Sequence, residues 1–148
     1  MKYEIYSELK LTDDFSVIEF TSIGKNGAIP KRIAFTTTEL ENVYNLAFGN
    51  IDANGEIDDI TVSDNGDRNK ILATVVNVVD DYTKKYPERW IVFSGSTKER
   101  TRLYRIAVGI NLEELSRKFE IYAFVQEKLK LFTKDMEISA FVIKRKKG

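Results

Sequence analysis

The side chains best suited to chemistry lie together in the second half of the sequence, around Gly95. A buried strand that turns through glycine into the start of a helix leaves backbone N–H groups pointing outward, and such groups bind anions. Arginines in the first turns of a helix oppose its dipole, so helix stability does not explain them. We therefore predict an anion-binding turn, suited to a phosphate, a carboxylate or a nucleic-acid backbone, with these candidate residues: Ser94, Ser96, Thr97, Arg100, Arg102 and Tyr104.

A structural explanation of the same segment stays open. Ser96 and Glu99 match the S-x-x-E capping box, in which the serine closes the helix N-terminus. Arg100 would then pair with a carboxylate of the acidic first half of the chain, and the other arginines would be solvated. On a helical wheel Arg100 and Tyr104 share one boundary of the apolar stripe, whereas Arg102 lies on the opposite flank.

Residues 50–58 imitate the first nine positions of a calcium loop. Oxygen-bearing residues occupy the first, third, fifth and ninth positions, and Gly55 stands at the sixth. The match is incomplete because Thr61 stands where the bidentate glutamate belongs. A hairpin built on Asn54-Gly55 explains the same residues without a metal.

Four acidic residues farther along, Asp58, Asp59, Asp64 and Asp67, carry the oxygen ligands that magnesium prefers. Side chains alternate between the faces of a strand, so Asp58 and Asp59 would point in opposite directions. Edge-strand solubility and helix capping account for these acids more simply. We therefore expect no cofactor.

The sequence contains neither histidine nor cysteine. These absences exclude Cys/His zinc sites, Ser-His and Cys-His nucleophile pairs, and a disulfide framework. The remaining alternative for catalysis is an RNA-acting enzyme of the messenger-RNA interferase type, in which Arg100, Arg102 and Tyr104 would position and stabilise the cleavage. That alternative rests on analogy between folds.

Length and composition predict a single globular domain over residues 1–148, with 43% hydrophobic and 31% charged residues. The N-terminus carries no apolar core of signal-peptide length, and no apolar run reaches the roughly 20 residues of a membrane-spanning helix. We expect a cytoplasmic protein without membrane association.

Formal charge is zero overall but unevenly placed. Residues 1–66 hold five Lys/Arg against twelve Asp/Glu, and residues 67–148 hold eighteen against eleven. The basic second half, which ends in Lys144-Arg145-Lys146-Lys147, would suit an anionic partner, and nucleic acid is a weakly supported one. Neutralisation inside the folded domain is the simpler explanation.

Two Asn-Gly pairs predict hairpins in the first half. A two-residue loop at Asn26-Gly27 would pair Phe20 with Ile33 and Ile18 with Phe35 on one apolar face. The second pair would join Val43–Ile51 to Ile57–Val62, with Ala47 opposite Val62 and Gly49 opposite Ile60. Residues Tyr3 to Leu11 would form a fifth strand or the sheet edge.

The second half alternates helices and strands. A helix is expected between the N-cap Asp67 and Pro87, followed by a buried strand Arg89–Phe93. A second helix would begin at Ser96 or Thr97 and bury an apolar stripe. The stripe consists of Leu103, Ile106, Ala107 and Ile110.

The chain then continues with a short helix over Asn111–Lys118 and two strands, Glu120–Gln126 and Glu137–Lys144. The element order is β-β-β-β-β-α-β-α-β-β. We predict an α+β fold, a mainly antiparallel sheet with two principal helices packed on one face.

Three blocks give the chain a family resemblance: Tyr44 to Gly49 (YNLAFG), Asn65 to Val75 (NGDxxKILATV) and Phe93 to Tyr104 (FSGSTxxRTRLY). The chain resembles, over nearly its full length, a bacterial single-domain family without an assigned activity. The resemblance implies one domain and transfers no catalytic role.

These observations favour a non-enzymatic binding or interaction module whose ligand is anionic or a protein partner. The alternatives are the histidine-free RNA-acting enzyme and a structural protein that self-associates through an edge strand. No particular oligomeric state is predicted.

Overall fold

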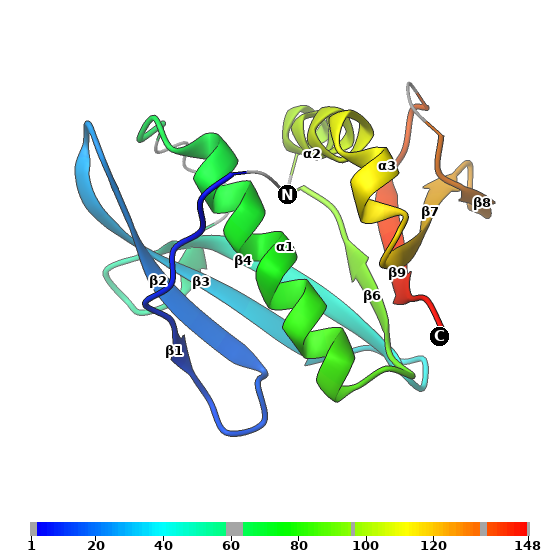
Figure 1. The fold of residues 1–148 in the computed structure, drawn as a ribbon, viewed down its shortest axis with the longest axis horizontal. Coiled ribbons are helices and arrows are strands. Elements are labelled where there is room, and N and C mark those ends of the chain that lie inside the picture. The colour runs from blue at the N-terminus through cyan, green and yellow to red at the C-terminus, as the bar shows by residue number, and fades with distance from the viewer. Residues whose placement is uncertain (1–2, 59–63, 96, 134–135, 148) are drawn as a thin grey trace. The chain divides into compact units, whose positions relative to one another are not determined.

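The computed structural model describes residues 3–58, 64–95, 97–133 and 136–147 (Figure 1). Over these residues the chain forms a mixed, mostly antiparallel nine-stranded sheet with two principal helices, which confirms the α+β class. The strands are β1 Lys10–Leu11, β2 Val17–Gly24, β3 Gly27–Thr37, β4 Val43–Ile51, β5 Ile57–Asp58, β6 Trp90–Phe93, β7 Phe119–Val125, β8 Lys128–Leu131 and β9 Ala140–Arg145, and the helices are α1 Arg68–Lys85, α2 Lys98–Ile110 and α3 Leu112–Leu115.

The strand order is β1-β2-β3-β4-β6-β9-β7-β8, and β5 pairs with β4. The chain divides into two compact units. The N-terminal unit comprises Met1–Thr36 and Leu46–Tyr82, and the C-terminal unit comprises Thr37–Asn45 and Thr83–Gly148.

The first predicted hairpin is present, but its register differs by two residues. Phe20 pairs with Lys31 and Ile18 with Ile33, because the loop consists of Lys25 and Asn26 between the paired Gly24 and Gly27. Gly27 has a φ of +88°, so the left-handed residue follows the two loop residues as in a G1 bulge. A shift of two residues keeps each side chain on its predicted face.

The core of the N-terminal unit lies between this hairpin and α1. Ile18, Phe20, Ile33 and Phe35 are all at most 4% exposed, as the apolar alternation predicts. Figure 1 shows α1 lying across one face of β2, β3 and β4. The ring of Tyr82 on α1 stacks on Phe35 with centroids 3.7 Å apart.

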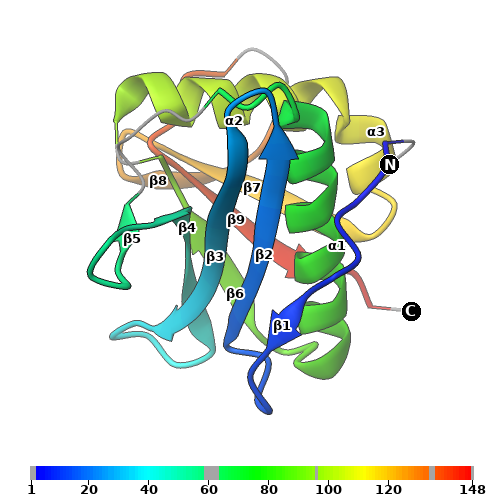
Figure 2. The same ribbon diagram turned by 90° about the vertical axis from the view of Figure 1, so that its left-hand side faces the viewer.

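The segment from Tyr3 forms only a short edge strand, Lys10–Leu11, which lies beside β2 in Figure 2. The rest of the segment is tied down by polar contacts. The Tyr6 amide donates to Thr74 Oγ1 on α1 at 2.8 Å, and the Tyr6 hydroxyl donates to Asp67 Oδ2. Ser22 donates to the same carboxylate oxygen at 2.5 Å and accepts from Asn65 at 3.0 Å. This hydrogen-bond network fixes the N-terminal segment to the start of α1.

The second hairpin pairs β4 with β5, and its predicted register was wrong by one residue. That register requires Ile51 opposite Asp58, whereas Ile51 pairs with Ile57. The loop is longer than two residues because Asp52 closes it: its carboxylate accepts from the amides of Asn54 and Glu56 at 2.9 and 3.0 Å. The predicted partners Ile60 and Val62 lie outside the described residues.

The C-terminal unit is built on the parallel pair β4–β6 and the antiparallel pairs β6–β9, β9–β7 and β7–β8. One face of these strands is its core, which also receives Val108 of α2 and Leu115 of α3. The strand residues of this core are each at most 9% exposed: Ile91, Phe119, Ile121, Ala123, Phe141 and Ile143. Strand β8 was not predicted, because a four-residue Lys-Leu-Lys-Leu alternation is too short to distinguish from a loop.

Helix α2 presents a different side to the core from the predicted one. Its buried residues are Thr101 and Val108, whereas Leu103, Ile106 and Ile110 are 47%, 40% and 67% exposed. Tyr104 orients the helix by an edge contact with Phe93, with ring centroids 6.2 Å apart. The apolar pattern identifies a stripe but not which side of the helix the sheet covers.

Candidate functional site

The predicted anion-binding turn is a strand-to-helix connection closed by its own hydroxyl groups. Thr97 is the N-cap of α2, and its side chain accepts from the Arg100 amide at 3.2 Å. This confirms the prediction that the helix begins at Ser96 or Thr97. The predicted capping box of Ser96 with Glu99 is wrong, because it requires Ser96 at the N-cap position that Thr97 occupies. Ser96 itself lies outside the described residues.

Thr101, which the sequence interpretation passed over, joins the two sides of this turn. Its Oγ1 accepts from the Gly95 amide at 3.0 Å and donates to the Thr97 carbonyl at 3.1 Å. Gly95 passes so close to the helix that a Cβ there would lie 2.4 Å from Arg100 Cβ and 2.5 Å from Thr101 N. The glycine is therefore required by this close approach, and two amides near the helix start already have partners inside the chain.

Of the remaining candidate residues, Arg100 and Tyr104 lie on one side of α2 and Arg102 on another. Ser94 is exposed, Arg100 is half-buried, and Arg102 is exposed two positions farther along α2, about 200° around the helix from Arg100. Tyr104 is half-buried against Phe93. Anion binding at this turn and the RNA-acting enzyme both stay predictions, and substitution of Arg100 by alanine followed by phosphate titration tests the first.

The residues considered above as metal ligands either accept hydrogen bonds from other groups of the chain or lie apart from one another. Among the described residues, no three acidic side chains come close enough to hold a metal ion together. The amide oxygen of Asn50 accepts from the Lys31 ammonium group, and Asp52 accepts from two amides of its own loop. Asp67 Oδ2 belongs to the network with Tyr6.

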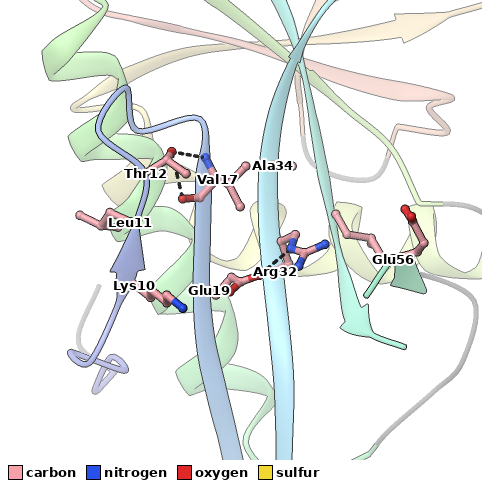
Figure 3. Close-up of a pocket in the computed structure, with 9 residues that line it drawn as sticks. Lys10, Leu11, Thr12, Val17, Glu19, Arg32, Ala34 and Glu56 are labelled. Carbon is pink, nitrogen blue, oxygen red and sulfur yellow. Dashed lines mark hydrogen bonds and ion pairs between the residues drawn. The ribbon is translucent and has the colours of Figure 1, made fainter. Parts of the chain in front are cut away.

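A hollow of about 590 Å³ lies on the N-terminal unit, over strands β1, β2, β3 and β5 (Figure 3). Figure 3 shows its charged side chains in the order Lys10, Glu19, Arg32 and Glu56 across the strands. Arg32 binds Glu19 through Nε and Nη2 at 2.7 and 2.6 Å and donates from Nη1 to the Gly55 carbonyl at 2.6 Å. These charges alternate in sign and neutralise one another, so the hollow presents no excess charge to a ligand.

The C-terminal unit carries a different surface on the side of its sheet opposite the core. The register sets Val43 beside Trp90, Val92 beside Val142, and Tyr122 beside Leu131. We call this surface the apolar face, defined by Val43, Trp90, Val92, Tyr122, Phe124, Leu129, Leu131 and Val142. It is an unusual arrangement for a sheet, because the second face of a strand pair covered on one side normally carries polar residues.

A shallow hollow of about 530 Å³ lies on the apolar face, and most of its lining is apolar. Trp90, Val92, Phe124 and Val142 line it, together with Leu40 from the segment before β4. Leu40 and Leu129 line the hollow and are nevertheless 67% and 48% exposed. The hollow therefore lies open at the surface and does not enclose a ligand.

Polar groups are few on the apolar face: Asn45 lies beside Val92, and Lys144 lies beside Trp90. Lys144 Nζ lies 5.1 Å from the centroid of the Trp90 ring and donates to the Glu88 carbonyl at 3.0 Å. Tyr122 donates to Glu120 at 3.3 Å, and burial followed by the Glu120 charge raises the pKa of Tyr122. The chemistry of this surface is that of apolar contact and aromatic packing.

The apolar face was missed at the sequence level. Its residues come from segments between positions 43 and 142, and only the strand order brings them together. One signal was present: the strand Trp90–Phe93 is apolar at every position, so both of its sides had to meet apolar surroundings. No helix in the described part of the chain is long and apolar enough to cross a membrane.

Comparison with known proteins gives one result. The model of a family of unknown function (DUF6934) matches residues 2–146, nearly the whole chain. No curated protein and no solved structure matches the chain.

Proposed function

The chain belongs to the DUF6934 family, whose function is unknown, and we propose from its surface that it is a protein-interaction module that binds a partner through the apolar face. The observation that carries the proposal is an open, largely apolar hollow over the strands of the C-terminal unit. Contiguous exposed apolar surface on a soluble protein marks an interaction site more often than scattered apolar residues do.

The composition of the apolar face favours a protein over a small molecule. Trp90, Tyr122 and Phe124 are the aromatic residue types that protein interfaces concentrate, and they come from β6 and β7 on either side of β9. Small-molecule sites enclose most of the ligand surface, whereas the leucines that line this hollow are themselves exposed.

Paired lysine substitutions test the proposal. Leu40→Lys with Leu129→Lys places two charges at the hollow on the apolar face, which both residues line, and both positions are exposed enough for the fold to accept them. The matched control is Leu11→Lys with Ile23→Lys in the N-terminal unit, where the side chains are 46% and 61% exposed. Each tagged protein is crosslinked in cells of the source organism, and its crosslinked proteins are identified by mass spectrometry.

We expect the control to recover the same crosslinked partner as the unmodified chain. The variant on the apolar face should recover at least tenfold less of it, and a tenfold change in affinity corresponds to about 1.4 kcal/mol. Circular dichroism checks that both variants fold. A partner captured equally by both variants would show that binding uses another surface. The molar mass of the purified chain in solution distinguishes a partner protein from self-association.

A further inference from the structure

The sheet of the C-terminal unit ends in a strand with an open edge. Strand β8 pairs with β7 on one side, and within the described residues it is the last strand in the order. All four of its residues are exposed. An edge strand presents unpaired N–H and C=O groups along its outer side, and a further extended segment can pair with them.

The side chains of β8 alternate strictly. Leu129 and Leu131 lie on the apolar face, opposite Phe124 and Tyr122 of β7. Lys128 and Lys130 lie on the other face, and both are exposed. Since paired residues of neighbouring strands share a face, a strand added to β8 would bring its side chains alternately beside leucine and beside lysine.

We infer that the partner binds as an extended strand along β8, with apolar residues that continue the apolar face and acidic residues that pair with Lys128 and Lys130. This inference rests on the proposed function and specifies the partner segment. Charge complementarity supports it at two scales. The two lysines lie on the edge itself, and the C-terminal unit as a whole holds sixteen Lys/Arg against ten Asp/Glu.

The same lysines argue against a second copy of this chain at the edge. An antiparallel pair of β8 strands that continued the apolar face would set lysine opposite lysine, and like charges directly opposite destabilise a strand pair. Lysine on an edge strand is a common protection against self-pairing. A partner strand with acidic residues at these positions avoids this repulsion between like charges.

Two synthetic peptides of seven residues probe the edge: one alternates glutamate with valine, and the other alternates lysine with valine. Both have the same apolar half and the same capacity for backbone hydrogen bonds. Dissociation constants are measured by calorimetry against the full chain and against Lys128→Glu with Lys130→Glu, whose fold is checked by circular dichroism. Amide chemical shifts locate the bound peptide, and N-methylation of alternate peptide amides removes the strand pairing.

We expect the unmodified chain to bind the glutamate peptide at least tenfold more tightly than the lysine peptide, with the largest shifts in β8. The double variant should reverse that preference, and N-methylation should abolish binding. Equal binding of both peptides, a preference that survives the charge reversal, or shifts away from β8 would overturn the inference. So would a dimer in sedimentation that Leu129→Lys abolishes. In any of these cases the Leu40→Lys, Leu129→Lys variant can still lose the crosslinked partner. The proposed function then stands, and only the strand mode of binding fails.

Discussion

At the residue scale, Tyr6 holds the N-terminal segment with one hydroxyl that has two roles. It donates to Asp67 and accepts from the Ile23 amide at 3.0 Å. We predict that Tyr6→Phe lowers the free energy of unfolding by about 1–2 kcal/mol, because a hydrogen bond to a carboxylate is lost and the Ile23 amide loses its acceptor. Urea unfolding measures the change.

The matched control for this substitution is Tyr122→Phe. Its hydroxyl makes a 3.3 Å hydrogen bond to Glu120 at an exposed position, so we expect a change of less than about 0.5 kcal/mol. Equal effects at the two positions would show that the contact of Tyr6 with Asp67 adds nothing to stability.

The same tyrosine predicts how stability depends on alkaline pH. Burial, followed by the hydrogen bond to Asp67, raises the pKa of Tyr6 above its ordinary value of 10.0. The unfolded chain therefore loses this proton first as the pH rises, and stability that is fully present below pH 10 is lost above it. Between neutral and alkaline pH, the free energy of unfolding of the Tyr6→Phe variant should therefore fall less than that of the unmodified chain. Parallel stability curves for the two proteins would contradict the assignment.

Gly95 provides a second prediction at this scale. Gly95→Ala would force a Cβ against the backbone of Arg100 and Thr101, and the strand exit would have to move away from α2. We expect a loss of about 1–3 kcal/mol, the usual cost of overpacking. Ser94→Ala, one residue earlier and exposed, should change stability by less than about 0.5 kcal/mol. Thermal unfolding of both variants distinguishes the close approach from a general sensitivity of the turn.

At the element scale, α2 tests whether a helix follows its apolar pattern or its tertiary contacts. The pattern requires Leu103 to be buried, whereas the structure buries Val108 and leaves Leu103 47% exposed. We predict that Val108→Ala costs about 1–2 kcal/mol through the cavity it leaves, and that Leu103→Gln costs less than about 0.5 kcal/mol. Urea unfolding that ranked the two substitutions in the opposite order would favour the rotation that the sequence pattern implies.

Most elements of the fold could be predicted because the local sequence signals agree with the contacts that the folded chain makes. Strand β4 has the bounds given by the apolar pattern, Val43–Ile51, and α1 lies between Asp67 and Pro87 as capping and helix-breaking residues require. Register was less predictable. The first loop keeps two residues but lies one position earlier, and the second gains residues because the Asp52 carboxylate closes it, which an Asn-Gly pair does not encode.

The candidate site also combines a local feature that the sequence predicts with a tertiary feature that it does not. The helix start followed from the sequence to within one residue, because an N-cap is a local feature, although the capping box pointed to Ser96 and the N-cap is Thr97. The apolar face depends on which strands become neighbours, and β4 lies beside β6 across more than forty residues of sequence. Periodicity within one strand carries no information about such pairing.

At the scale of the whole molecule, two elements cross the boundary between the compact units. Strand β4 has its first three residues in the C-terminal unit and the rest in the N-terminal unit, and α1 passes from one unit to the other after Tyr82. Loss of either unit would thus unravel part of the other. We predict one cooperative unfolding transition, in which the most protected amides of β2 and β9 exchange with the same free energy. Hydrogen exchange followed by NMR measures it, and different values for the two strands would show independent units.

Trp90 is positioned to report binding at the apolar face by its fluorescence. It is the only tryptophan in the sequence, and it lies in the apolar face with the Tyr122 ring 5.8 Å away. Indole fluorescence responds to the polarity of its surroundings, so a protein that covers this surface should shift the emission to shorter wavelength and shield it from acrylamide quenching. Occupancy of the surface can then be titrated on the unlabelled chain.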